Sequence, residues 1–344
     1  MNSASRRPAL RELVNQFLQR LGYQIVRLRA EDRRSMGLSH DPSVQLPPGA
    51  AEYLRADNPR LVQLRKAYAA TGWPVVGESV FWNQREVDRN VLLPWFRGDN
   101  AYVWQYRQLG ADARLKRYIA LREVQDHDTR GLLSRLNEDG LFGCWTENYG
   151  RHGLISRDLL DSVREINFLD RHAGLFDRPG LRVLDIGAGY GRLAYRMSQV
   201  LPNLVRYDCL DAVPESTFLC EYYLRFRGVT PPARAVPLHE IDGGLAPDGY
   251  DLALNIHSFP ECTYAAIEWW MARVKSLRVP WLLIVPNDTE KLLSAETDGS
   301  LKDFTPLIRD AGYELAVKAP VLETPEVREL AKLHDHFFLF RRRA

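Results

Sequence analysis

A glycine-rich turn between a predicted strand and a predicted helix constrains this chain more than any other feature. Residues 183–186 are mostly apolar and typical of a buried strand, the motif Gly187-x-Gly189-x-Gly191 follows at once, and residues 193–197 have helical character. Glycine has no Cβ, so such a turn lets bare backbone approach a nucleotide-like ligand. The sequence therefore predicts an α/β fold that binds its ligand at the end of this strand.

The spacing of the glycines indicates which cofactor is bound. A dinucleotide fingerprint has the pattern G-x-G-x-x-G and would require glycine at position 192, where this chain has Arg. The observed pattern, preceded by an acid, instead resembles the first motif of class I S-adenosylmethionine (SAM) methyltransferases. The resemblance implies that SAM is the cofactor and that it is bound by Asp185, Gly187, Ala188, Gly189 and Gly191.

A second acidic residue lies where the next strand is expected to end. Residues 207–212 are typical of that strand, and the carboxylate of Asp211 can accept hydrogen bonds from both ribose hydroxyls of a cofactor. The alternative role of Asp211 is to cap the helix that opens at residues 214–216. Given the glycine motif, we predict that Asp211 and Ala212 contact the ribose.

Further cofactor contacts are expected from the same fold. The segment at Leu238 and His239 lies where this fold contacts adenine, and Asn255 belongs to the fourth strand. The helix that begins near residue 156 leads into the glycine motif, so its start should lie over the cofactor. Arg157 then meets either the carboxylate of SAM or a structural ion-pair partner.

Strands and helices alternate beyond Asp211, as a doubly wound parallel sheet requires. The last two strands resemble the antiparallel closing hairpin of class I methyltransferases, which implies a seven-stranded sheet in the order 3-2-1-4-5-7-6. The expected helices are 215–227, 264–277 and 303–311, and the expected strands are 233–238, 250–256, 281–285, 312–317 and 337–340.

The chain divides into three predicted segments. Residues 1–50 contain an amphipathic helix and a linker, residues 51–175 form a mostly helical cap, and residues 176–344 form the SAM-binding domain. Apolar residues at helical spacing alternate with arginines over 6–29, a pattern that suits an anionic membrane surface. Docking of this helix on its own domain or on a second subunit is the alternative, so membrane contact and homo-oligomer formation both stay open.

Aromatic residues are concentrated in the cap segment and alternate with polar ones. Aromatic faces stack on the C–H faces of carbohydrates, whose hydroxyls need hydrogen-bond partners. The tryptophans could equally form the core of the cap. As a group they favour a sugar or glycoside acceptor, and the candidate acceptor contacts are Tyr102, Trp145, Glu147 and Tyr149.

Longer strings narrow the resemblance to one group of enzymes, the bacterial sugar O-methyltransferases. It runs from about residue 50 to 290, and it implies methyl transfer to a sugar hydroxyl in glycan or glycosylated natural-product biosynthesis. Proline at position 260 departs from the usual pattern. The strings that carry the resemblance are 96–100, 156–162, 183–194, 222–228 and 255–262.

Methyl transfer requires an acceptor oxygen aligned with the methyl group and a base that removes its proton. His257 and Glu261 follow the fourth strand, at the sheet edge where α/β enzymes place their chemistry. Imidazole titrates near neutral pH, so His257 is the predicted base, with Glu261 orienting or replacing it and Glu147 as a further candidate. Both could instead satisfy backbone groups at a turn. We predict no metal, because no carboxylate cluster with magnesium-like spacing is evident.

Composition excludes several other classes. The chain has 344 residues, 45% hydrophobic and 26% charged, with a formal net charge of +2, so it lacks the basic stripe that binds nucleic acid. No run approaches the ~18 apolar residues of a membrane span, and we expect a cytoplasmic protein with reduced cysteines. Two alternatives remain: methylation of an amine or phenol, and a non-catalytic SAM-binding partner subunit.

Overall fold

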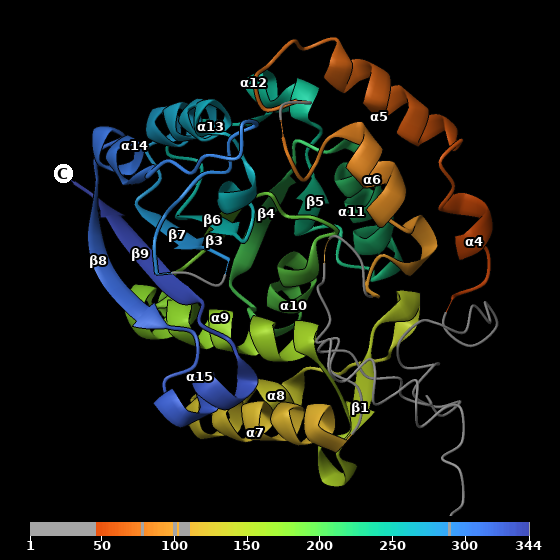
Figure 1. Ribbon diagram of the computed structural model, residues 1–344, viewed down its shortest axis with the longest axis vertical. Coiled ribbons are helices and arrows are strands. Elements are labelled where there is room, and N and C mark those ends of the chain that lie inside the picture. The colour runs from red at the N-terminus through yellow and green to blue at the C-terminus, as the bar shows by residue number, and fades with distance from the viewer. Residues whose placement is uncertain (1–45, 77–78, 99–101, 103–110, 288–289, 344) are drawn as a thin grey trace, which may run out of the picture.

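The computed structural model describes residues 46–343, apart from residues 77–78, 99–101, 103–110 and 288–289. The predicted amphipathic helix at 6–29 therefore lies outside the described residues. The described part of the chain is organised around one large sheet with helices on both faces (Figure 1).

The large sheet has seven strands in the order β5-β4-β3-β6-β7-β9-β8. All neighbouring pairs are parallel except those of β9, which runs antiparallel to both β7 and β8. Numbered from β3, this order is 3-2-1-4-5-7-6, which confirms the predicted fold. The strands are β3 (Leu181–Ile186), β4 (Leu204–Leu210), β5 (Ala233–Ala235), β6 (Leu252–Ile256), β7 (Trp281–Val285), β8 (Tyr313–Pro320) and β9 (His336–Arg342).

Helices cover the two faces of this sheet. One face carries α9 (Arg157–Ala173), α10 (Arg192–Val200) and α11 (Pro214–Phe226), and the other carries α12 (Ile241–Gly244), α13 (Tyr264–Leu277) and α14 (Thr305–Asp310). The predicted strand at 233–238 is shorter than expected, because Pro237 starts the 3-10 turn η5 (Leu238–Glu240). The other connecting turns are η4 (Leu175–Asp177) and η6 (Phe259–Glu261).

The side chains of β3 show why both faces of the sheet are apolar. Leu181 and Val183 pack into the core under α9 and α10, whereas Leu184 and Ile186 pack into the core under α13 and α14. Successive residues of a strand point to opposite faces, and a parallel strand covered on both faces is apolar at nearly every position. Arg182 and Asp185 are the exceptions in this strand: Arg182 pairs with Asp251 at 2.9 Å, and Asp185 lies at the carboxyl end where the ligand is expected.

The predicted cap occupies two separate places (Figure 1). Its first part, with α4 (Ala50–Tyr53), α5 (Pro59–Ala69), α6 (Gln84–Asn90) and η1 (Leu93–Trp95), packs beside α11 and shares its hydrophobic core. Its second part packs beneath α9 together with α15 (Pro325–Ala331). This second part contains α7 (Ala111–His127), α8 (Leu132–Arg135), β1 (Thr146–Asn148), η3 (Gly150–His152) and β2 (Leu154–Ser156), whereas η2 (Leu141–Gly143) packs on η1 of the first part.

A buried ionic cluster around Glu138 joins the parts of the cap to the sheet layer. Arg97 donates to both oxygens of Glu138 at 2.8 and 2.9 Å, and Arg196 of α10 donates to the same carboxylate at 2.9 Å. Ser156, the N-cap of α9, donates its hydroxyl to Glu138 at 2.5 Å. Burial raises the pKa of Glu138, but the two arginines outweigh it and hold this pKa well below the usual range.

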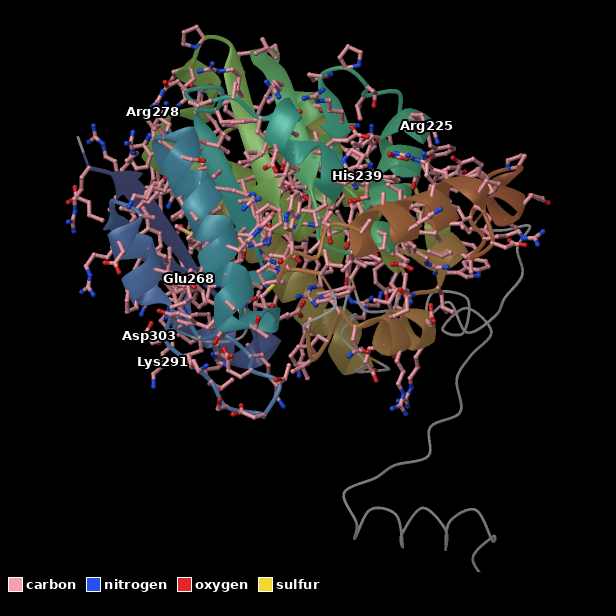
Figure 2. All side chains as sticks on the ribbon, turned by 90° about the horizontal axis from the view of Figure 1, so that it is seen from above. Arg225, His239, Glu268, Arg278, Lys291 and Asp303 are labelled. Carbon is pink, nitrogen blue, oxygen red and sulfur yellow. The ribbon has the colours of Figure 1, made fainter. Side chains whose placement is uncertain are left out.

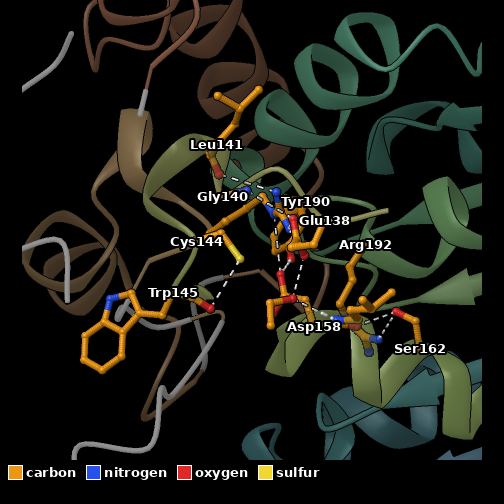
Figure 3. Close-up of polar contacts among 12 residues, drawn as sticks. Glu138, Gly140, Leu141, Cys144, Trp145, Asp158, Ser162, Tyr190 and Arg192 are labelled. Carbon is orange, nitrogen blue, oxygen red and sulfur yellow. Dashed lines mark hydrogen bonds and ion pairs between the residues drawn. The ribbon is translucent and has the colours of Figure 1, made fainter. Parts of the chain in front are cut away.

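Two further contacts tie the glycine turn to α9, as Figure 3 shows. Tyr190 in the turn donates its hydroxyl to Asp158 at the start of α9. Arg192 at the start of α10 donates at 2.8 Å to Ser162 and to both oxygens of Glu165. The first turn of α9 is therefore held beside the glycine turn.

We expect Glu138→Ala to lower the free energy of unfolding by about 3–5 kcal/mol, because it leaves two buried guanidinium groups without their shared carboxylate. Urea denaturation at neutral pH measures this loss. The contribution of Glu138 is present above the ordinary glutamate pKa and disappears in strong acid, because the folded-state pKa is lowered.

The matched control for Glu138→Ala is Asp57→Ala. Asp57 pairs with Arg55 on the surface, where the two side chains are 69% and 60% exposed. This variant should cost less than about 1 kcal/mol. Equal effects of the two substitutions would show that the buried cluster does not stabilise the fold.

Candidate active site

A pocket opens at the carboxyl ends of the parallel strands, where doubly wound folds bind their ligands. The glycine turn after β3, the end of β4 and the segment after β6 form its floor, and Val75, Ser79 and Trp82 of the cap form part of its wall. Ten of the predicted site residues line this pocket. They are Tyr102, Arg157, Asp185, Gly187, Ala188, Gly189, Asp211, Ala212, His257 and Glu261.

Two glycines of the turn are required for different physical reasons. A Cβ on Gly187 would lie 2.2 Å from Oγ of Ser258, so any side chain there would collide with the segment after β6. A Cβ on Gly191 would lie 2.9 Å from Sγ of Cys220 in α11. Both residues also have positive φ angles, 75° and 84°. Gly191 therefore allows helix packing and does not line the pocket, unlike the other predicted residues of the turn.

Asp211 connects the glycine turn to the start of α11. Its two carboxylate oxygens accept backbone N–H groups, one from Gly189 at 3.0 Å and one from Val213 at 2.9 Å. Burial raises the pKa of Asp211 to about 6, although these hydrogen bonds favour the charged form. A carboxylate oxygen can accept more than one hydrogen bond, so the capping contact leaves acceptor capacity that faces the pocket.

Two more predicted residues, Asp185 and Arg157, line the pocket. Asp185 is buried and accepts a 2.7 Å hydrogen bond from the hydroxyl of Tyr207, and burial raises its pKa to about 7. Arg157, the first residue of α9, pairs with Asp161 at 3.2 Å. Burial raises the pKa of Asp161, but neighbouring arginines outweigh it and lower this pKa to about 2. This ion pair gives the pocket one donor group and one acceptor group side by side.

Asn255 does not line the pocket. Its side chain is fully buried, donates to the carbonyl oxygen of Ile186 at 2.9 Å and accepts the N–H of Phe259 at 2.9 Å. Both ends of the amide are thus used to hold β6 and the following turn against the end of β3. The predicted cofactor contact is replaced by a structural one.

Leu238 and His239 also lie outside the residues that line the pocket, because α5 packs over them. The N–H of Leu238 donates to the hydroxyl of Tyr68 at 2.8 Å, and the His239 ring meets the edge of the Tyr68 ring at 5.9 Å between centroids. Figure 2 shows His239 beside α5. The sequence does not reveal this cover, since α5 precedes the segment by about 170 residues in the chain.

Three of the four predicted acceptor contacts lie away from the pocket, in or beside the small hairpin formed by β1 and β2. Glu147 pairs with Arg117 at 3.2 Å, and the hydroxyl of Tyr149 donates to the backbone of Arg114 at 2.8 Å. Trp145 is buried. Glu147 and Tyr149 attach the hairpin to α7. Of the four predicted acceptor contacts, Tyr102 is the one that lines the described pocket.

His257, Asn287 and Glu261 form a hydrogen-bonded chain that lines the same pocket as Asp211. Nδ1 of His257 lies 2.5 Å from Oδ1 of Asn287. The Asn287 amide nitrogen donates to Oε1 of Glu261 at 3.1 Å and to the backbone oxygen of His257 at 3.1 Å. Nε2 of His257 lies 4.0 Å from the buried carboxylate of Asp335. The two predicted catalytic residues are therefore brought together through a third residue.

Glu261 is also held by the cap. The indole N–H of Trp82 donates to Oε2 of Glu261 at 2.6 Å, and the hydroxyl of Ser79 donates to its backbone oxygen at 3.0 Å. Burial raises the pKa of Glu261 to about 7, while the hydrogen bonds from Trp82 and Asn287 oppose this shift. A carboxyl group with a pKa near neutrality can exchange protons at physiological pH.

The sequence prediction missed Ser79, Trp82 and Asn287 as site residues. The sequence does contain a signal for Asn287, because this residue lies two positions beyond the strand β7, at the sheet edge that also carries His257. Trp82 belongs to the aromatic-rich segment, but no pattern in that segment distinguishes it from the other tryptophans. Ser79 lies 182 residues before its partner Glu261 and has no such signal.

Within residues 46–343 and outside the four internal gaps, no three His, Cys, Asp or Glu residues gather as a metal-binding group. In the same part of the chain, no helix has both the length and the apolar character needed to span a bilayer.

Comparison with known proteins shows a likeness of fold. No protein-family model matches the chain, and no curated protein gave a significant match. Solved structures do match. The [4+2]-cyclase SpnF has a TM-score of 0.41 and 13% identity, over 66% of this chain and 96% of that one. Magnesium protoporphyrin IX methyltransferase from Synechocystis, with bound SAM, has a TM-score of 0.39 and 13% identity, over 70% and 100%.

A SAM-dependent methyltransferase from Aquifex aeolicus is also similar, with a TM-score of 0.35 and 17% identity, over 52% of this chain and 96% of that one. One of these three proteins is named a cyclase, and a fold by itself does not decide a reaction.

We expect Trp82→Phe to raise the pKa of Glu261 above its value of about 7, because the lost indole N–H stabilises the charged carboxylate. Carbon-13 NMR titration of labelled glutamate measures this shift. The control is Trp73→Phe, since Trp73 packs on Trp269 and makes no described contact with Glu261. A pKa that stays constant or falls in Trp82→Phe would show that this hydrogen bond does not set the protonation of Glu261.

Proposed function

We propose that the protein is a SAM-dependent methyltransferase that methylates a hydroxyl group of a sugar or glycoside. The proposal rests on one observation: the glycine turn with Asp211 and the chain His257-Asn287-Glu261 line the same pocket. A cofactor cradle and a proton acceptor are the two elements that methyl transfer to oxygen requires.

The glycine turn, Asp211 and Arg157 fit SAM. Gly187 and Gly189 leave backbone exposed toward the pocket, and Asp211 retains acceptor capacity for ribose hydroxyls. The Arg157 and Asp161 pair offers a cation and an anion to the amino-acid end of the cofactor. SAM supplies an electrophilic methyl group when bound, and these residues orient it.

His257 is the proposed base, and its surroundings support proton transfer. Its Nδ1 is engaged by Asn287, and its Nε2 lies 4.0 Å from the Asp335 carboxylate. An imidazolium formed by proton uptake is stabilised by a nearby negative charge. Glu261, linked to His257 through Asn287 and with a pKa of about 7, is the second group that can accept a proton.

The walls around these groups support a sugar as the acceptor. Trp82, Trp270 and Tyr102 supply aromatic surface to the same pocket, and Ser79, Glu261 and Asn287 supply hydrogen-bonding groups. This combination suits the apolar C–H faces and the hydroxyls of a carbohydrate.

We expect the protein to bind SAM and S-adenosylhomocysteine but not NAD, and Asp211→Asn to weaken SAM binding by about 1.5–3 kcal/mol through loss of a charge-assisted hydrogen bond. Isothermal titration calorimetry measures both. Asp251→Asn is the matched control, because Asp251 also accepts a backbone N–H, that of Arg182 at 2.8 Å, and does not line the pocket. Binding of NAD, or equal SAM affinity in the two variants, would contradict the cofactor assignment.

We expect His257→Gln to reduce kcat about 10²–10⁴-fold, with SAM affinity unchanged, because the base would be lost while the cofactor contacts remain. Transfer of labelled methyl groups from SAM to a panel of glycosides measures turnover. His239→Gln is the control, since His239 does not line the pocket. Full activity of His257→Gln would move the role of base to Glu261, which Glu261→Gln then tests, and loss of SAM binding would place His257 in the cofactor pocket.

A further inference from the structure

We propose that Asn287 is a positioning residue that fixes the tautomer of His257, so that Nδ1 carries the proton and Nε2 is the proton acceptor. The hydrogen-bonding chemistry of one amide group carries this inference. It rests on the proposed function only in its kinetic consequence, because the tautomer is a property of the protein without cofactor or acceptor.

The orientation of the Asn287 amide follows from its partners. Its nitrogen is 3.1 Å from the backbone oxygen of His257 and 3.1 Å from Oε1 of Glu261. A backbone carbonyl can only accept a hydrogen bond, and the amide NH2 group can only donate. The nitrogen must therefore face these two oxygens, which leaves the amide oxygen facing the imidazole ring.

The tautomer of His257 follows from this orientation. Oδ1 of Asn287 lies 2.5 Å from Nδ1 of His257, and an amide oxygen can only accept. Nδ1 must therefore carry a proton. In a neutral imidazole the other nitrogen then has the lone pair, so Nε2 is the atom that can take a proton from an acceptor, and the Asp335 carboxylate 4.0 Å from Nε2 would stabilise the charged ring that results.

The backbone of His257 is held by the same arrangement. His257 has a φ angle of 64°, in the left-handed region that few residues other than glycine adopt. Its N–H donates to the carbonyl oxygen of Val285 at 2.8 Å, and its own carbonyl oxygen accepts from Asn287. Asn287 thus binds both the main chain and the ring of His257, while Val285 anchors the same residue to the end of β7.

The experiment uses nitrogen-15 NMR of the full chain labelled at histidine, with the His257 signals assigned from His257→Gln. At a pH where the ring is neutral, we expect the proton on Nδ1 in the wild type. Asn287→Ala should shift His257 toward the Nε2-protonated form, and Asn287→Asp, which keeps an oxygen acceptor, should restore the Nδ1 proton. The proposal is overturned if the wild type carries the proton on Nε2, or if Asn287→Ala leaves the tautomer unchanged.

The matched control is Asn203→Ala. The Asn203 amide also donates to two carbonyl oxygens, those of Leu175 and Arg178 at 2.8 and 2.6 Å, but Asn203 does not line the pocket. This variant should leave the His257 signals as they are in the wild type. If Asn203→Ala also changes the tautomer, the shift seen in Asn287→Ala comes from a general loss of stability, and the role of Asn287 is overturned.

A kinetic measurement tests the consequence for turnover. We expect Asn287→Ala to lower kcat about 10- to 100-fold, with the KM for SAM unchanged and partial recovery in Asn287→Asp, as for residues that orient a reacting group. If the wild type carries the proton on Nδ1 but Asn287→Ala has the same kcat as the wild type, the positioning role is overturned. Absence of methyl transfer in the wild type would instead refute the proposed function, and the tautomer measurement would still stand.

Discussion

The close contact between Ser258 and the backbone of Gly187 is the constraint on which the pocket depends. No Cβ fits between them, because it would lie 2.2 Å from the serine hydroxyl. Asn255, near the end of β6, donates a further hydrogen bond to the carbonyl oxygen of Ile186. The segment after β6 is thereby packed directly on the glycine turn after β3, and His257 is held within reach of whatever the turn binds.

Burial of charge is the second feature that shapes the site. Asp185, Asp211 and Glu261 are carboxyl groups whose pKa values burial raises to about 7, 6 and 7. The same fold keeps Glu138 ionised, because two guanidinium groups face it. A buried carboxylate keeps a low pKa where guanidinium groups bind it directly, because their charge compensates for the lost solvent. Its pKa rises where its hydrogen-bond donors are neutral, and it can then accept a proton near neutral pH.

The cap completes the site from a distance in sequence. Trp82 and Ser79 reach Glu261 across about 180 residues of chain, and Tyr68 reaches Leu238 across 170. The contact of Tyr68 covers the sheet edge at Leu238, whereas Trp82 and Ser79 line the pocket at Glu261. They explain why the segment at Leu238 and His239, expected to contact a cofactor, packs under α5, while the residues around Trp82 become part of the pocket wall.

The sequence by itself determined the local chemistry: the strand, the glycine turn and the acid at its end, the strand order and the placement of His257 and Glu261 after β6. The strand, the turn and the positions of these side chains depend on neighbours close in the chain and on the periodicity of apolar residues, whereas the strand order was implied by the resemblance to class I methyltransferases. Only the tertiary structure decided that Asn287 joins His257 to Glu261, that Asn255 is structural, and that Glu147 and Tyr149 attach a hairpin to α7. Those outcomes depend on contacts between segments far apart in the chain. Packing of the segments determines which hydrogen-bond partner a side chain meets there, and no periodic pattern in the sequence encodes it.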